Sequence, residues 1–148
     1  MKKYFLVLGL AASTAMAFAT GGSVFGYGGF RNPTEGVATF RMQIEEDSLG
    51  KASFLFASEG AHGDYPDTVF KSVQITQYMN LASNRVRVHG RGLLYNMIPV
   101  FYVATFTDGG SRGSDHLELH AWNSRNGMHI VHFSEFLTEG TIVVTPGK

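Results

Sequence analysis

The sequence predicts an all-β protein, built as a single antiparallel β-sandwich of about eight short strands. Two observations support this fold class. Apolar and polar residues alternate with a period of two in several segments, and turns rich in Gly, Asn and Asp separate those segments at fairly regular intervals. No segment after the first 19 residues sustains the 3.6-residue apolar period of a helix. A closed β-barrel made from the same strands is the alternative arrangement.

The first predicted strand covers residues 37–45, in which apolar and polar side chains alternate strictly. Two glutamates at its end would also suit a helix over 37–46, but the alternation favours a strand. A five-residue loop over 46–50, which contains a glycine, leads to a second strand at 51–58. The two strands therefore form a hairpin.

The next two strands are predicted at 69–77 and 85–94. We expect Val69, Val73 and Ile75 to face inward on the earlier one. The apolar positions of the alternating strands also predict which side chains form the core. Ten residues are predicted to be largely buried: Phe40, Phe54, Phe56, Val73, Val86, Val88, Val103, Phe106, Leu117 and Leu119.

Two glycines, Gly90 and Gly92, lie on the apolar side of the strand at 85–94, which predicts a bulge or a close backbone approach there. The segment 100–107 is the most apolar of the set, so we expect it to be central with both faces covered. The remaining strands are predicted at 117–121, 128–133 and 141–145.

The first 19 residues have the three parts of a secretory signal peptide: two lysines, an apolar run over 4–12, and small residues that end in Ala17 and Ala19. The apolar run is shorter than the roughly 20 residues of a membrane-spanning helix. We therefore expect cleavage after Ala17 or Ala19. Because no cysteine lies near the cleavage point, we expect the product to be free in the periplasm or secreted, without a membrane span.

Three regions are predicted: a signal peptide at 1–19, a Gly-rich flexible leader at 20–33 and one β-sandwich domain at 34–148. Loss of the signal leaves ten Lys and Arg against 12 Asp and Glu, with the signs interspersed along the chain. This balance does not suggest a nucleic-acid partner. The chain has no cysteine, so apolar burial and sheet hydrogen bonds must stabilise it.

Three segments carry a family resemblance: 36–44 with 50–56, which reads GVATFRMQI and GKASFLF; 86–95, VRVHGRGLLY; and 102–119, YVATFTDGGSRGSDHLEL. In these segments the chain resembles the post-COAP-1 type of bacterial secreted β-domain. The resemblance implies an exported β-domain. It carries over no catalytic residue.

Potential metal ligands alternate along the segment His116-Leu-Glu118-Leu-His120, on one face of a predicted strand. At about 3.3 Å per residue, neighbours two apart lie about 6.7 Å apart and could share an ion, whereas His116 and His120 lie about 13 Å apart. A site would therefore combine Glu118 and one of these histidines with His129 or His132 from the next strand. We expect instead a solvated outer face that holds no functional metal.

Two pairs of aspartates bracket turns and could bind calcium: Asp108 with Asp115, and Asp64 with Asp67. Neither pair has the spacing of a dedicated calcium loop. Carboxylates that accept backbone N–H groups in turns explain both pairs equally well.

The strand at 85–94 presents Arg85, Arg87, His89 and Arg91 on its polar face, which could bind an anionic glycan or a lipid head group. A solvated face that discourages edge pairing is the competing interpretation. The segment Gly109–Gly113 matches the Gly-x-Ser-x-Gly nucleophile elbow in letters, but no helix follows it, so we expect a flexible turn.

Together these features predict an exported, non-enzymatic β-domain with a binding or structural role at the cell envelope, with no cofactor and an unknown ligand. The alternative is a small secreted cupin-like metal protein or metalloenzyme that uses the C-terminal histidines. A third possibility, an open-ended barrel that carries an apolar ligand, rests on the 12 phenylalanines alone.

Overall fold

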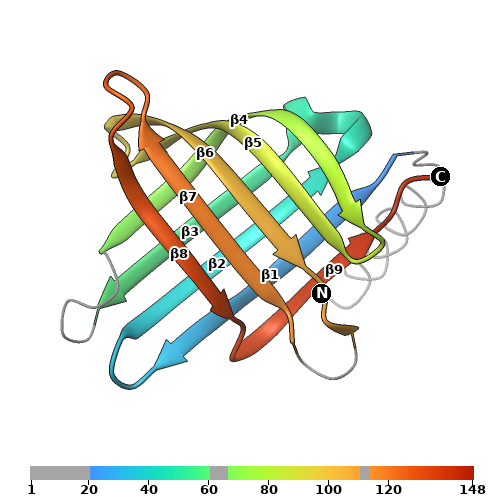
Figure 1. The fold of residues 1–148 in the computed structure, drawn as a ribbon, viewed down its shortest axis with the longest axis horizontal. Helices are drawn as coiled ribbons and strands as arrows, with labels where there is room; N and C mark the ends of the chain where they lie inside the picture. The colour runs from blue at the N-terminus through green and yellow to red at the C-terminus, as the bar shows by residue number, and fades with distance from the viewer. Residues whose placement is uncertain (1–20, 61–66, 111–113) are drawn as a thin grey trace, which may run out of the picture.

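The structure is a computed structural model that describes residues 21–60, 67–110 and 114–148. Its strands form one antiparallel sheet in the order β8-β7-β6-β5-β4-β3-β2-β1-β9 (Figure 1). The sheet confirms the all-β class. The strands are β1 (Ser23–Asn32), β2 (Gly36–Glu45), β3 (Ser53–Gly60), β4 (Thr68–Ala82), β5 (Arg85–Leu94), β6 (Ile98–Thr107), β7 (His116–Asn123), β8 (His129–Phe136) and β9 (Glu139–Thr145).

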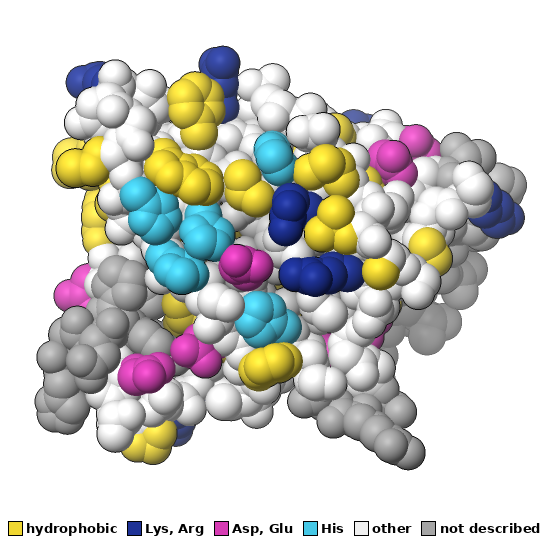
Figure 2. Space-filling model, in the orientation of Figure 1, with side chains coloured by type: hydrophobic (Ala, Val, Ile, Leu, Met, Phe, Trp, Pro, Cys, Tyr) yellow, Lys and Arg dark blue, Asp and Glu magenta, His cyan; other side chains and the backbone are white. Residues whose placement is uncertain are grey.

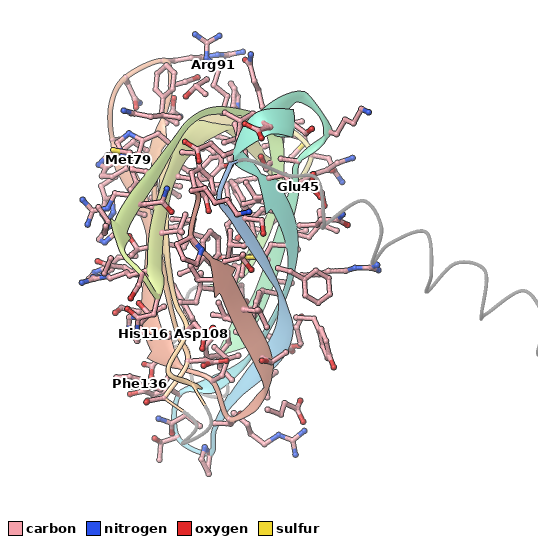
Figure 3. All side chains as sticks on the ribbon, turned by 90° about the vertical axis from the view of Figure 1, so that its right-hand side faces the viewer. Glu45, Met79, Arg91, Asp108, His116 and Phe136 are labelled. Carbon is pink, nitrogen blue, oxygen red and sulfur yellow. The ribbon has the colours of Figure 1, made fainter. Side chains whose placement is uncertain are left out.

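The sheet curls into a half-barrel, with β5–β8 on one side and β1–β3 with β9 on the other (Figures 1 and 3). The long strand β4 bends between the two sides. In the part of the chain that the structure describes, no ladder joins β8 to β9, so the barrel is not closed. The two facing walls are compatible with either predicted arrangement, sandwich or barrel.

A short 3₁₀ helix, η1 (Glu46–Lys51), takes the place of the loop predicted over 46–50. Its first two side chains hold the start of β1, since the carboxylates of Glu46 and Asp47 accept the backbone N–H groups of Gly22 and Gly21. Among the described residues no helix is long and apolar enough to span a membrane.

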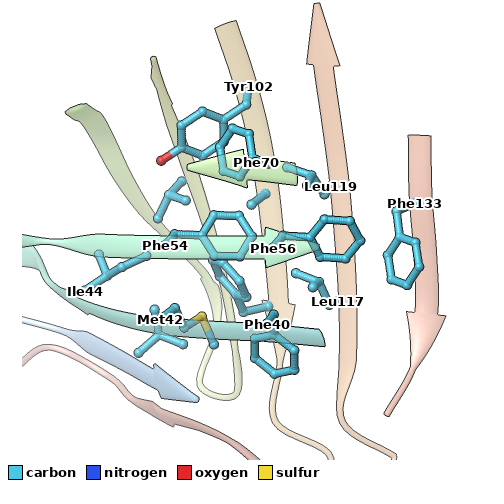
Figure 4. Packing of buried hydrophobic residues seen from close by; sticks show 14 of the residues in the cluster. Phe40, Met42, Ile44, Phe54, Phe56, Phe70, Tyr102, Leu117, Leu119 and Phe133 are labelled. Atoms are coloured by element: carbon cyan, nitrogen blue, oxygen red, sulfur yellow. The ribbon is translucent and has the colours of Figure 1, made fainter. Parts of the chain in front are cut away.

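The core lies between the two walls and is rich in aromatic rings (Figure 4). Phe54 on β3 meets Phe106 on β6 edge to face, with the ring centroids 5.2 Å apart. The ring of Phe133 on β8 packs against the rings of Phe56 and Phe30 on the opposite wall, with centroid distances of 4.7 and 4.9 Å. Eight of the ten residues predicted to be buried are buried, which confirms the alternation on β2, β3, β5 and β7.

The prediction for β4 was wrong at two of its three inward positions. Val69 and Val73 are 50% and 64% exposed, whereas Ile75 is buried. The ladder between β4 and β5 shifts register between Ser72 and Gln74, and again further along. Such a bulge inserts an extra residue and reverses the side-chain parity beyond it, so a period of two drawn through the whole strand fails.

The prediction that both faces of β6 are covered was also wrong. Tyr102, Ala104 and Phe106 face the core. Val103 is half-buried on the outer face, and Phe101 on that face is 46% exposed. The outer face of this strand is covered at Thr105, which is 2% exposed, but not at Phe101, so only the inner face is packed throughout.

The glycines of β5 confirm the predicted close approach. A Cβ added to Gly90 would lie 2.7 Å from a ring atom of Tyr102, and one added to Gly92 would lie 2.5 Å from the ring of Phe70. The two rings therefore lie directly over backbone that carries no side chain.

The flexible leader predicted over residues 20–33 was wrong where the structure describes it. Residues 23–32 form β1, which pairs with both β2 and β9. Val24 and Phe30 are buried, and a Cβ at Gly26 would lie 2.8 Å from the Met42 side chain. Because the glycines have no side chains, they leave space for the side chains of β2. The composition of this segment is typical of a linker, but the segment is a packed strand. The predicted signal peptide lies outside the described residues.

Candidate functional site

The outer face of β5–β8 carries a regular grid of polar and aromatic side chains (Figure 2). Directly opposed residues in antiparallel strands share a face, so the register defines rows across the four strands. Read from β5 to β8, the rows are Arg91–Phe101–Trp122–His129, His89–Val103–His120–His132, Arg87–Thr105–Glu118–Ser134 and Arg85–Thr107–His116–Phe136.

A bulge in β8 gathers the histidines. The ladder pairs Val131 with Ala121 and then His129 with Trp122, which leaves Ile130 as the extra residue. His129 and His132, three residues apart, consequently both lie on the outer face.

Glu118, His120 and His132 form the tightest part of this grid. Their ligand atoms all lie within 4.8 Å of one another. Glu118 Oε1 and His120 Nε2 are 2.9 Å apart, and the rings of His120 and His132 are nearly parallel at 4.4 Å. His129 lies next to them, with its ring 5.6 Å from that of His120. Of the three ligands predicted on β7, Glu118 and His120 thus lie beside both of the histidines predicted on β8.

His116 lies apart from this cluster, as the strand spacing predicts. Its Nε2 is 3.1 Å from Ser134 Oγ, and its ring packs against Phe136. Burial lowers the pKa of His116, and the charge of Arg85 adds to this effect, while Glu118 opposes it. The neutral form of this histidine is therefore favoured.

Glu118 is the anionic centre of the grid. The hydrogen bond with His120 lowers the pKa of its carboxyl, with further lowering from the charges of His120, His116 and Arg85, against an opposing effect of burial. Glu118 therefore stays ionised at neutral pH.

Arg85, Arg87 and Arg91 lie on the outer face of β5, as predicted. Arg87 Nε donates to Thr105 Oγ1, and the Arg91 guanidinium lies 5.5 Å from the centre of the Phe101 ring. Within the described residues, none of the three forms an ion pair with a carboxylate. Their charges are therefore available to an anion in solution.

Asp108 and Asp115, the predicted calcium pair, form hydrogen bonds to the backbone of β9 on the side that has no partner strand among the described residues. Asp115 accepts the N–H groups of Gly109 and Ile142 at 2.8 and 2.6 Å. Asp108 accepts those of Gly110 and Val144 at 2.8 and 3.2 Å. Each of the four carboxylate oxygens thus takes a backbone N–H group, so the geometry agrees with the turn interpretation and gives both residues a structural role.

The other sequence candidates contribute less. Asp67 accepts the N–H of Gly60, and its predicted partner Asp64 lies outside the described residues. Ser111 of the nucleophile-like segment also lies outside them.

Sequence reasoning missed a shallow groove on the outer face of the opposite wall. Thr39 on β2 and Ala57 on β3 form its floor, and the register places Gly29 of β1 next to them in the same row. Three adjoining pockets lie along this row, between Glu139 at one end and Val69 at the other. Small side chains at outward positions of neighbouring strands are the signal, but only a known register reveals that they align.

No known protein family, curated protein or solved structure matches this chain. The resemblance to the post-COAP-1 type of domain stays a prediction.

Proposed function

We propose that this chain is an exported, non-catalytic β-domain that binds an anionic glycan of the cell envelope on the outer face of β5–β8. The observation that carries the proposal is the set of three arginines along β5, which form no ion pair with a carboxylate among the described residues and lie beside the exposed ring of Phe101 and the half-buried ring of Trp122. Arginine binds carboxylate and phosphate groups through paired N–H donors. The flat faces of Phe101 and Trp122 suit the C–H groups of sugar rings.

Charge balance favours this face over the groove on the opposite wall. The groove has Arg41 and Lys71 along one side, but Glu59 and Glu139 lie at its ends. On β5, by contrast, cations occupy three of four successive outward positions. Acidic polymers should therefore prefer the outer face of β5–β8.

Polygalacturonate and its methyl ester provide a direct test, because they share one sugar backbone and esterification removes the negative charge of each carboxylate. We expect the mature protein to bind polygalacturonate in the presence of EDTA, to lose binding as salt rises, and to leave the ester unbound. The variants Arg87→Gln and Arg91→Gln should each bind several-fold more weakly.

Arg41→Gln is the matched control, since it removes the same charge from the outer face of β2. Equal weakening by Arg41→Gln and Arg87→Gln would contradict the assignment to β5. Binding to vesicles of anionic phospholipid without binding to polygalacturonate would identify a membrane surface as the target and overturn the proposal.

A further inference from the structure

We propose that Glu118, His120 and His132 form a binding site for one divalent transition-metal ion, with copper(II) bound most tightly. The three donors come from the facing strands β7 and β8 and already lie within 4.8 Å of one another. This site goes beyond the proposed glycan binding, because it uses a different set of side chains and requires none of the arginines.

The spacing of Glu118 and His120 matches that of two ligands of one ion. With bonds of about 2.0 to 2.1 Å, donor atoms 2.9 Å apart subtend an angle of about 90° at the metal. In the metal-free protein these atoms share a hydrogen bond. On binding, the ion takes the place of this hydrogen bond, so that Nε2 of His120 is the ligand atom and the ring proton lies on Nδ1.

His132 supplies the third donor from the neighbouring strand. His120 and His132 are directly opposed in the ladder, and their rings are stacked at 4.4 Å. His132 is exposed, whereas His120 and Glu118 are half-buried. The exposed ring is free to rotate, so its nitrogen can close the remaining gap at the cost of a rotamer change.

The three residues are the combination that the sequence left open: Glu118, one histidine of β7 and one histidine of β8. His116 and His120 lie too far apart along one strand, about 13 Å, to share an ion. Neighbouring strands lie only about 4.8 Å apart, so a cross-strand partner is closer than a second residue on the same strand. His132 is that partner, and His116 is not needed.

Copper(II) is the ion that this donor set favours. Imidazole nitrogens and a carboxylate oxygen suit tetragonal copper(II) and nickel(II) sites. Copper(II) also stands highest in the general affinity order. His129, whose ring lies 5.6 Å from His120, can complete a fourth position.

The neighbouring charges leave room for a cation. Glu118 brings one negative charge to the site. Arg85 and Arg87 on β5 oppose a metal ion, but their backbone lies two strands from β7, about 9.6 Å away. Glu118 lies in the row of Arg87, between the row of Arg85 and that of the two histidines.

Trp122 provides the measurement. It is the only tryptophan of the chain, and its ring lies 5.8 Å from that of His120 and 5.3 Å from that of His129. Titration of untagged mature protein with Cu(II) should quench its fluorescence with a stoichiometry of one ion per chain, and calorimetry should give the same stoichiometry. Ni(II) and Zn(II) should bind more weakly, and lower pH should weaken all three.

The variants His120→Gln, His132→Gln and Glu118→Gln should bind Cu(II) about tenfold more weakly or worse. His89→Gln, in the same row as His120 but on β5, and His116→Gln are the matched controls and should bind as the original protein does. Circular dichroism verifies that each variant is folded.

Equal affinity in the three site variants, or equal weakening in the controls, would overturn the site. Tighter binding of zinc than of copper would overturn the choice of ion. Because the glycan assay contains EDTA, a failure of the metal site leaves that assay unaffected, and the two proposals can fail separately.

Discussion

The two outer faces of this sheet cover the same core but differ in what they expose. The face of β5–β8 presents histidines, arginines and aromatic rings in aligned rows. The face of β1–β3 presents small residues that form a groove, with Tyr27 and Leu55 exposed beside it. Inward positions on both walls are mostly apolar, with Ser58 and Thr68 as buried polar exceptions. The outward positions do not determine the fold, so they are free to differ in chemistry.

The largest expected effect tests whether the two walls form one cooperative unit. Phe54→Ala removes the ring that joins β3 to Phe106 on β6, and should cost about 3 to 5 kcal/mol of unfolding free energy. Leu55→Ala, the exposed neighbour, should stay within about 0.5 kcal/mol. Denaturant unfolding followed by Trp122 fluorescence and by circular dichroism should give one midpoint. Two separate midpoints would show that the walls unfold independently.

The next effect concerns the side of β9 that has no strand partner. Asp115→Ala leaves the buried N–H of Ile142 and that of Gly109 without their acceptor, and should cost about 1 to 3 kcal/mol. Asp67→Ala, which removes one exposed hydrogen bond to Gly60, should cost less. Thermal unfolding of both variants gives the comparison. An equal loss of stability would mean that the buried carboxylate has no special role.

A smaller or similar effect tests the close approach at β5. Gly90→Ala introduces a methyl group against the Tyr102 ring, and overpacking of this kind costs about 1 to 3 kcal/mol. Gly50→Ala is the control, because an added Cβ there meets nothing within 4 Å. Stability measured by chemical denaturation should fall only in the first variant. The added methyl group would also meet the backbone carbonyl oxygen of Gln74 on β4, so unchanged stability of Gly90→Ala would show that both β4 and the ring can shift.

The smallest expected effect concerns two glutamates where the walls meet. Glu35 lies in the turn between β1 and β2, and Glu135 lies on β8. Burial raises the pKa of the Glu135 carboxyl, and the charge and hydrogen bond of Glu35 raise it further. A raised folded-state pKa means that the folded protein gains stability as pH falls through that pKa toward the unfolded value near 4.5.

Replacement of Glu35 by Gln should therefore stabilise the protein at pH 7, within about 0.5 kcal/mol, and the gain should shrink at pH 5. Denaturation at both pH values measures the difference, with Glu59→Gln as the control on β3. A gain that is the same at both pH values would contradict the assignment to Glu135.

Strands β2 to β9 could be predicted from alternating or continuous apolar residues between turns, but β1 could not. Gly26 and Gly28 occupy inward positions of that strand, so its alternation is invisible in the sequence. On β4 the bulges reverse the parity, which explains the error at Val73. Local patterns record which residues are apolar, whereas bulges and glycine contacts depend on the partner strand.

The sequence predicts which residues could bind a metal, but not which of them lie close together. The sequence places Glu118 and His120 on one face and leaves His129 and His132 as alternatives. The choice depends on the register of β7 against β8 and on the extra residue Ile130, which no single-strand pattern contains. The arginine row needed no such information, because all three residues belong to one strand.

The pairing of β1 with β9 determines when the domain can finish folding. The other seven ladders join strands that are neighbours in the chain, whereas this one brings residue 23 opposite residue 145. Contacts of such long sequence separation form late, because a long loop must close before they stabilise anything. The sheet therefore gains its last ladder only when the two ends of the described chain come together.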